Sequence, residues 1–313
     1  MPIQQFQANP RRARLVVASA LLGATLAACA GMTSTPSSLP ITSGQQLERQ
    51  RQLARDDLQR WADAVRAASG QQGFAIVGDA TGQVGDWEEQ LGSNKVALMA
   101  GKVEDSVGLS NETPDAQEVR WQDGSVQTLP TISAAQALKD LQAAGVQPCP
   151  ECDALQVTDA KLTTAQIQTS RGSATVPAWE FSLQGTAVRV TRVAISPRVN
   201  ISVTPPLRNP NDPPVGLSID SASGTVDGKQ LTVSFVGAPE PGSEVCGADY
   251  TAEAVESQTA VVVIIIEHDN ATAGPCRLVG ATRTATLQLA APPGDRAVLE
   301  VKNGLPVPVT LGR

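Results

Sequence analysis

The sequence predicts an α+β fold: an amphipathic helix, then a mixed α+β domain, then a C-terminal antiparallel β-sandwich. Three observations support this prediction. Apolar residues recur at helical spacing in only two regions, whereas most other runs beyond residue 70 alternate with a period of two. Turn residues interrupt these runs at short intervals. Only 3% of the residues are aromatic while Ala, Val, Thr and Gly abound, so the core must be aliphatic.

Residues 1–28 have the features of an export signal. Arg11, Arg12 and Arg14 precede an uncharged run from Leu15 to Ala28, which ends directly at Cys29. The run is shorter than the roughly 20 residues that a membrane-spanning helix requires. We therefore expect cleavage before Cys29. The segment resembles the lipobox of bacterial lipoproteins, in which the cysteine thiol carries diacylglycerol.

That resemblance implies that Cys29 is lipidated and holds the protein at the cell membrane, facing outside the cytoplasm. The Arg11-Arg12 pair leaves both the general secretory and the twin-arginine export routes open. Residues 29–42 are rich in Ser, Thr and Pro, which predicts a disordered tether between the anchor and the folded part.

Residues 43–70 are predicted to form an amphipathic helix. Ser43 and Gln46 have the spacing of a capping box, and Gly70 lies just past the far end. The apolar stripe consists of Leu47, Ala54, Leu58, Trp61 and Val65. A stripe of this width usually docks on its own domain, and a surface for a partner or a coiled coil is the alternative.

Residues 71–204 are predicted to form the α+β domain. The expected strands are Phe74–Gly78, Lys95–Gly101, Glu118–Trp121, Val126–Leu129, Leu155–Leu162, Ala174–Leu183 and Ala187–Ile195. Asp123-Gly124 is a strong hairpin signal. One helix is expected from Ser133, with Gln136 three residues later, to Gly145. The Pro-rich stretch 205–214 is expected to be a linker.

Residues 215–313 are predicted to form the β-sandwich. The expected strands are Leu217–Ile219, Gln230–Val236, Tyr250–Ala254, Ala260–Ile266, Thr284–Leu289, Ala297–Val301 and Pro306–Leu311. Residues 261–266 are one continuous β-branched run, which predicts a central strand covered on both faces.

The four cysteines beyond Cys29 predict two disulfides, because the number is even and the expected compartment permits oxidation. Three pairings are possible. We favour Cys149 with Cys152 and Cys246 with Cys276, since each pair then lies within one predicted domain. Cys149-Pro150-Glu151-Cys152 also has the spacing of a thiol-disulfide exchange site. Such a site usually starts a helix, whereas here a helix is expected to end and a strand to begin, so a structural disulfide is favoured.

No catalytic residue, metal ligand or cofactor site is predicted. His268 is the sole histidine, and the polar residues around it are typical of a solvated turn. A zinc site needs about four ligands, and His268 and the cysteines are too scattered. The sequence contains no Gly-x-Ser-x-Gly motif and no phosphate-binding glycine loop. A hydrolase with paired carboxylates stays an alternative, because such pairs meet only in the fold.

Trp87 and Trp121 lie beside acidic and amide residues, as in a platform for a sugar or an apolar ligand. Core packing is the commoner use of aromatic residues, as the alternation of Trp179 with Phe181 suggests.

The charge balance excludes one class of partner. Removing the three arginines of residues 1–28 leaves 21 basic residues against 31 acidic ones, a net charge of −10. A nucleic-acid-binding protein needs a clustered basic face, and no run of Lys or Arg follows the signal.

Two segments resemble uncharacterised secreted and lipid-anchored actinobacterial proteins. The first comprises Cys149–Cys152, Leu155–Thr158 and Val176–Phe181, and the second comprises Cys276, Arg283–Leu289 and Pro293–Val298. The group has Leu at the position of Pro293. The resemblance implies a secreted or lipid-anchored location but no activity.

The expected function is therefore non-catalytic binding in the cell envelope, with an unknown envelope protein or an apolar ligand as partner. A thiol-disulfide protein that uses Cys149 and Cys152 is the enzymatic alternative, beside the hydrolase. A carrier of an apolar ligand would require an enclosed apolar cavity in residues 71–204.

Overall fold

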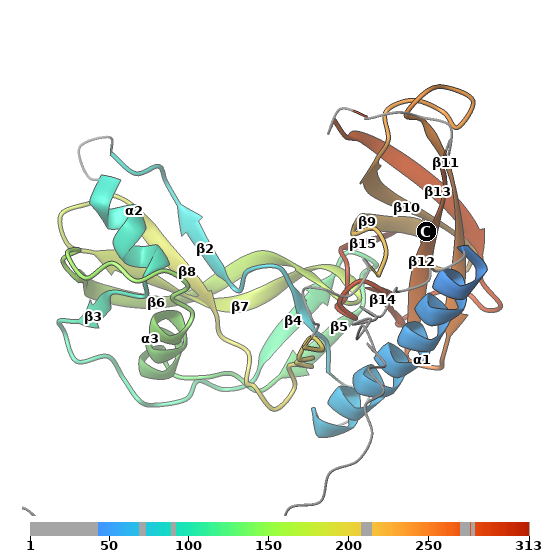
Figure 1. Cartoon of the computed structure of the whole chain (residues 1–313). Coiled ribbons are helices and arrows are strands. Elements are labelled where there is room, and N and C mark those ends of the chain that lie inside the picture. The colour runs from blue at the N-terminus through green and yellow to red at the C-terminus, as the bar shows by residue number, and fades with distance from the viewer. Residues whose placement is uncertain are drawn as a thin grey trace, which may run out of the picture. The chain divides into compact units, whose positions relative to one another are not determined.

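The computed structural model describes residues 43–68, 73–88, 92–207, 215–269, 276 and 279–312. These residues belong to one compact unit. The predicted export signal, Cys29, the tether 29–42, Gly70 and most of the linker 205–214 lie outside the described residues. In the described part the fold is mixed α+β, with an N-terminal helix followed mostly by strands in three sheets (Figure 1). No helix there is both long and apolar enough to cross a membrane.

The first sheet is built around two long strands. Its members are β1 (Ile76–Val77), β2 (Thr81–Val84), β3 (Val103–Asp105), β4 (Gln117–Trp121), β5 (Val126–Leu129), β6 (Leu155–Thr169), β7 (Gly172–Leu183) and β8 (Arg189–Val193). Strands β6 and β7 form an antiparallel pair along most of their length. The other edge of β7 pairs first with β4 and then with β8, and β2 continues the sheet beyond β8. The other edge of β6 pairs with β3 and β1 only at its two ends.

The predicted strand Lys95–Gly101 is wrong, because residues 92–99 form helix α2 (Gly92–Met99). Periodicity does not separate a short helix from a strand in an apolar run of this length. Only Ala97 of the run is buried, in a cluster with Leu138 and Leu141. Strands β2 and β3 were not predicted, because each is very short and largely exposed.

Helix α3 (Ala134–Ala143) begins where the sequence predicts. Ser133 is its N-cap, and the Ser133 hydroxyl accepts a hydrogen bond from the backbone N–H of Gln136 at 3.2 Å. The amide of Gln136 donates to Asp140 instead of returning to the cap, so only half of the capping box forms.

The hairpin predicted at Asp123-Gly124 is confirmed. Strands β4 and β5 pair antiparallel, and Gly124 has a φ of +84° in the turn between them. The Gly124 N–H donates to the carbonyl of Trp121 at 3.0 Å, which closes the turn.

The C-terminal region contains two sheets. The second sheet has the order β13 (Ala281–Gln288), β10 (Gln230–Gly237), β9 (Ile219–Thr225), β15 (Val309–Gly312), and the third has the order β11 (Ala248–Glu256), β12 (Ala260–Asp269), β14 (Ala297–Glu300). The prediction that all pairs are antiparallel is wrong for two of them. Strand β12 pairs parallel with β14, and β9 pairs parallel with β15. Between β12 and β14 the chain crosses to the second sheet as β13, and β14 then lies beside β12 in the same direction.

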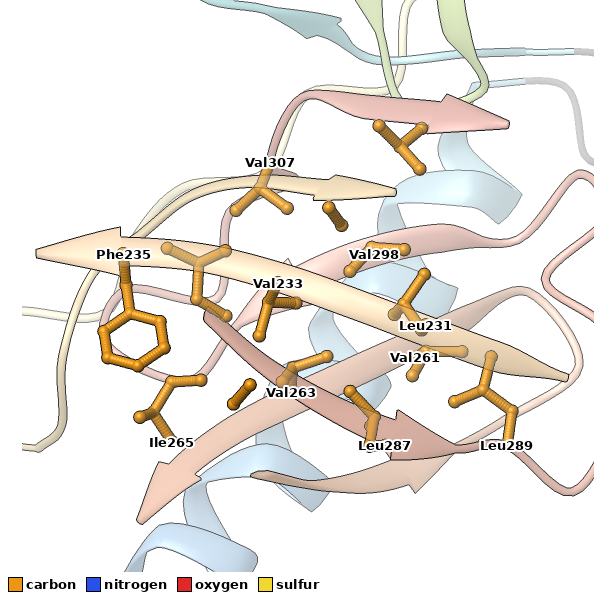
Figure 2. Packing of buried hydrophobic residues seen from close by; sticks show 14 residues of the cluster. Leu231, Val233, Phe235, Val261, Val263, Ile265, Leu287, Leu289, Val298 and Val307 are labelled. Atoms are coloured by element: carbon orange, nitrogen blue, oxygen red, sulfur yellow. The ribbon is translucent and has the colours of Figure 1, made fainter. Parts of the chain in front are cut away.

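The β-branched run of β12 is buried on both faces, as predicted. Val261, Val263 and Ile265 face β10 of the second sheet across an apolar core that includes Phe235 (Figure 2). Val262 and Ile264 belong to another cluster, which contains Trp61 and Val65.

Helix α1 (Ser43–Ala67) covers the other face of β12 and runs alongside the third sheet (Figure 1). The apolar stripe therefore docks within its own unit. Polar contacts add to the apolar ones. The Arg51 guanidinium donates to both carboxylate oxygens of Glu253, at 2.7 and 2.8 Å, and the Gln50 amide donates to the carbonyl of Val215 at 2.6 Å.

Candidate functional site: a donor-rich hollow beside helix α1

A hollow of about 170 Å³ lies where helix α1 meets the turn between β6 and β7 and the turn that precedes β14. Several segments far apart in the sequence contribute to its wall. The lining residues are Trp61, Val65, Gly73, Ser170, Arg171, Ile201, Gln258, Thr259, Asp295 and Arg296.

Two buried hydrogen-bond donors of this lining have no acceptor within the described ranges of the chain. Trp61 is 2% exposed, and its indole Nε1 has no partner among the described residues. The Nε of Arg171 is likewise buried without a partner there. A buried donor that is left unsatisfied costs about 1–3 kcal/mol, so such groups normally contact water or a ligand. Two of them in one lining therefore mark the hollow as a place for an acceptor.

The guanidinium of Arg171 is held on two sides. It lies over the ring of Trp121, 4.2 Å from the centroid, and its Nη2 donates to the Oδ1 of Asp295 at 2.9 Å. Trp121 is itself fixed, because its indole N–H donates to the Thr169 hydroxyl at 3.2 Å and its ring meets Phe74 edge to face. These contacts hold Arg171 in place at the hollow.

Arg296 contributes to the wall but not to the supply of free donors. Its Nη1 donates to the Oε2 of Glu256 at 2.7 Å, and its Nη2 donates to the carbonyls of Ala291 and Pro292. Burial opposes the ionisation of Glu256. The hydrogen bonds from the backbone N–H of Ala290 and from Arg296 outweigh this effect and hold the pKa of Glu256 below its ordinary value.

Ser170 supplies a further donor. Its hydroxyl oxygen accepts a hydrogen bond from the backbone N–H of Ala75 at 3.0 Å, which leaves the hydroxyl proton available. The charges of the site nearly balance, because Arg171 pairs with Asp295 and Arg296 pairs with Glu256.

The lining combines apolar, amide, hydroxyl and guanidinium side chains with one carboxylate. It contains neither histidine nor cysteine, and its one carboxylate, on Asp295, is 76% exposed and paired with Arg171. Indole and guanidinium N–H groups both suit an oxygen acceptor such as a carboxylate.

The predicted disulfide cysteines are bonded as favoured from the sequence. Cys149 pairs with Cys152, and Cys246 pairs with Cys276. The first pair lies in the turn between α3 and β6, where Lys102 donates to the carbonyls of Pro150 and Cys152 at 3.0 and 2.7 Å. Cys149 is only 5% exposed, and the pair follows a helix instead of starting one. This turn therefore lacks the helix N-terminus and the exposure typical of exchange sites.

His268 contacts a hydroxyl on the neighbouring strand of the third sheet. It lies near the end of β12 rather than in a turn, and its Nε2 is 2.8 Å from the Thr251 hydroxyl on β11. In the described part of the chain, no group of three or more His, Cys, Asp and Glu side chains is placed to hold a metal ion.

The two tryptophans considered as a platform belong to different clusters. Trp121 is in a buried core with Phe74, whereas Trp87 packs partly buried against the cluster around Phe181. Trp121 is therefore a core residue that positions Arg171, and it does not form a shared platform with Trp87.

The buried carboxylates of the described residues serve structural contacts. Asp57 on α1 accepts a hydrogen bond from Arg60, and Glu300 on β14 accepts one from the backbone N–H of Ile219 at 2.8 Å. Neither carboxylate lines the hollow, and these contacts do not favour the hydrolase alternative.

A carrier of an apolar ligand requires an enclosed cavity. The region of the first sheet has an open groove instead. A hollow of about 310 Å³ lies between β2, α2 and the end of α3, and it opens to solvent. Met99 in its wall is 41% exposed. This groove does not shield an apolar ligand from water.

Sequence reasoning missed this site. Trp61 was assigned only to the stripe of the helix, and Arg171 carried no signal because it sits in an ordinary hairpin turn. Comparison with protein-family models, curated proteins and solved structures finds no match to the chain.

Proposed function

We propose that this chain is a lipid-anchored extracytoplasmic protein that binds a small organic acid without transforming it. The observation that carries the proposal is that two buried donors, Trp61 Nε1 and Arg171 Nε, line one hollow and find no acceptor in the described part of the chain. A carboxylate supplies two oxygens with several lone pairs and so satisfies both donors. A hollow of about 170 Å³ suits a small molecule rather than a polymer.

The polar lining favours an acid over the apolar ligand expected from the sequence. Asp295 occupies one nitrogen of Arg171 and is largely exposed, so a ligand carboxylate competes with Asp295 for the guanidinium. An envelope protein as an additional partner remains compatible with this site.

The proposed anchor is diacylglycerol on Cys29, joined to the folded part by the tether 29–42. In this arrangement a mixed α+β region is followed by a C-terminal β-sandwich that carries α1. The lipobox-like sequence supports the anchor, and the two disulfides support an oxidising compartment.

Calorimetric titration of the purified chain with acetate, succinate and inorganic phosphate tests the binding site. The informative variant is Trp61→Phe, which keeps an aromatic ring and removes the N–H. We expect at least one carboxylate to bind the unchanged protein. Its affinity for Trp61→Phe should be about 10- to 150-fold lower, since a hydrogen bond to a charged group is worth about 1.5–3 kcal/mol.

The matched control is Trp87→Phe, because the buried indole N–H of Trp87 also lacks a partner among the residues that the structure describes, but Trp87 does not line the hollow. We expect its affinity to equal that of the unchanged protein. The proposal is wrong if neither acetate nor succinate binds, or if Trp61→Phe binds the carboxylate as tightly as Trp87→Phe does. Ordered water alone would then fill the hollow.

Mass spectrometry of the membrane fraction tests the anchor. We expect a mature chain that begins at a lipidated Cys29, and we expect Cys29→Ala to abolish the modification. An unmodified Cys29 or an intact Met1 in that fraction would contradict the anchor.

A count of free thiols under mild reduction tests the thiol-disulfide alternative. We expect Cys149–Cys152 to resist reduction, because its first cysteine is buried. A pair that is reduced as readily as a small-molecule disulfide would favour the enzymatic alternative.

A further inference from the structure

Strand β6 has an edge that the described chain leaves unpaired along its middle. One edge pairs with β7 from Val157 to Thr169. On the other edge, β3 pairs only with residues 155–157 and β1 only with residues 168–169. Residues 158–167 therefore present backbone N–H and C=O groups on that side without a strand partner among the described residues.

A hollow of about 260 Å³ runs along this edge. Its walls are consecutive residues, 164–167 of β6 and 79–84 in and before β2, whereas β8 contributes the alternating residues Thr191 and Val193. Successive side chains of a strand point to opposite faces, so a hollow on a face is lined by every second residue. The consecutive lining places this hollow at the edges of β6 and β2, above one face of β8.

The course of the chain explains why the position beside β6 is vacant. Strand β1 runs antiparallel to β6, with Val77 opposite Gln168. Continued in register, it would pair with residues 164–167. The chain instead turns away at Gly78, which has a φ of +85°, and forms β2 against β8. The hollow lies where the continuation of β1 would have been.

We propose that this hollow binds an extended peptide segment, which adds to β6 antiparallel and in line with β1. This edge already pairs with two extended segments, β1 antiparallel and β3 parallel, so its backbone groups suit a third. The lining side chains are Thr, Gly, Gln, Ala, Val and Ile, and Asp79 is the single charged one. The peptide recognised is therefore an uncharged segment with small or β-branched side chains, held mainly through its backbone.

Selection of a phage-displayed random peptide library on the purified chain tests the proposal. Selected peptides are synthesised, and their affinity is measured by fluorescence anisotropy, together with versions N-methylated at alternate residues. Because only every second peptide N–H faces β6, we expect one methylated set to lose at least about tenfold in affinity and the other to bind normally.

The protein variants use the same strand. Ala165→Trp fills the hollow and should abolish binding, whereas Thr158→Trp, on an exposed residue outside the lining, should leave it unchanged. Thermal melting checks that both variants fold. If Ala165→Trp does not fold, the affinities of the methylated peptides for the unchanged protein test the proposal. Trp61→Phe should bind the peptide normally, which separates this site from the proposed acid site.

Three results would overturn the proposal: no peptide enriched, affinity that ignores the pattern of methylation, or binding that survives in a folded Ala165→Trp variant. If the chain self-associates and Ala165→Trp abolishes this association, the occupant of the hollow is a second copy of the chain. That result would also contradict the proposal.

Discussion

Gly304 packs directly against the carboxylate of Asp57, a residue of helix α1 that is 0% exposed. A Cβ at position 304 would overlap the Asp57 oxygen, and Gly304 has a φ of +70°, which favours glycine. The turn after β14 and the middle of α1 therefore lie in close contact at this point.

Gly304→Ala should destabilise the protein strongly. Placing a side-chain residue in the left-handed region costs about 1–2 kcal/mol, and the overlap with Asp57 adds to that cost. Gly185→Ala is the control, because Gly185 has a φ of +77° with open space around the added atom. Chemical denaturation should give a loss at least about 1 kcal/mol larger for Gly304→Ala. Equal losses would mean that the contact with Asp57 is unimportant.

Ile264→Ala should destabilise the docking of α1 on the third sheet. Ile264 is fully buried in the cluster that contains Trp61, so its truncation should cost about 2–5 kcal/mol. Ile266→Ala, on the same face of β12 but only partly buried, should cost less. Urea titrations of both variants would check this order, and a reversed order would contradict the packing described for β12.

The two disulfides should differ in their contribution to stability. Chain entropy gives about 3–4 kcal/mol for a link across 30 residues and about 1.5–2 kcal/mol for a link across 3 residues. The double variant Cys246→Ser/Cys276→Ser should therefore melt well below Cys149→Ser/Cys152→Ser. Calorimetry of the two variants would measure the difference. Coinciding melting temperatures would show that loop closure does not govern the effect.

Glu256 should make the protein less stable in acid. The folded pKa of Glu256 is lowered, so its contribution is present above its unfolded pKa of about 4.3 and is lost as the pH falls through the folded value. Glu256→Gln should cost on the order of 1–2 kcal/mol at pH 7 and flatten the acid limb of the stability curve. Glu118→Gln, in an exposed pair with Arg120, should change stability by less than about 0.5 kcal/mol. Denaturation between pH 7 and pH 3 would compare them.

Local signals in the sequence predicted much of the fold. The cap at Ser133, the turn at Asp123-Gly124 and the run 261–266 each depend on neighbouring residues, and each is found in the structure. Short elements with little burial were less predictable, which explains why α2 was taken for a strand and β2 was missed.

The candidate site depends on contacts that no local pattern encodes. Trp61 and Arg171 lie far apart in the sequence, and they line one hollow only because α1 docks on the third sheet. The hydrogen-bond state of their nitrogens follows from burial, which the sequence does not reveal. The same holds for the parallel pairing of β12 with β14, since the route of the chain between sheets leaves no periodic signal.

The docking of α1 on β12 also sets an order of events for a chain that emerges N-terminus first. Helix α1 is the first described element, but the strands that cover its apolar stripe begin only at residue 248. Until those strands have been synthesised, Trp61 and Val65 stay exposed to solvent. A nascent chain that ends before β12 therefore has an exposed apolar helix face and a tendency to aggregate. Such truncated products should require chaperones or be degraded, because α1 is covered only after the strands from residue 248 onward have been synthesised.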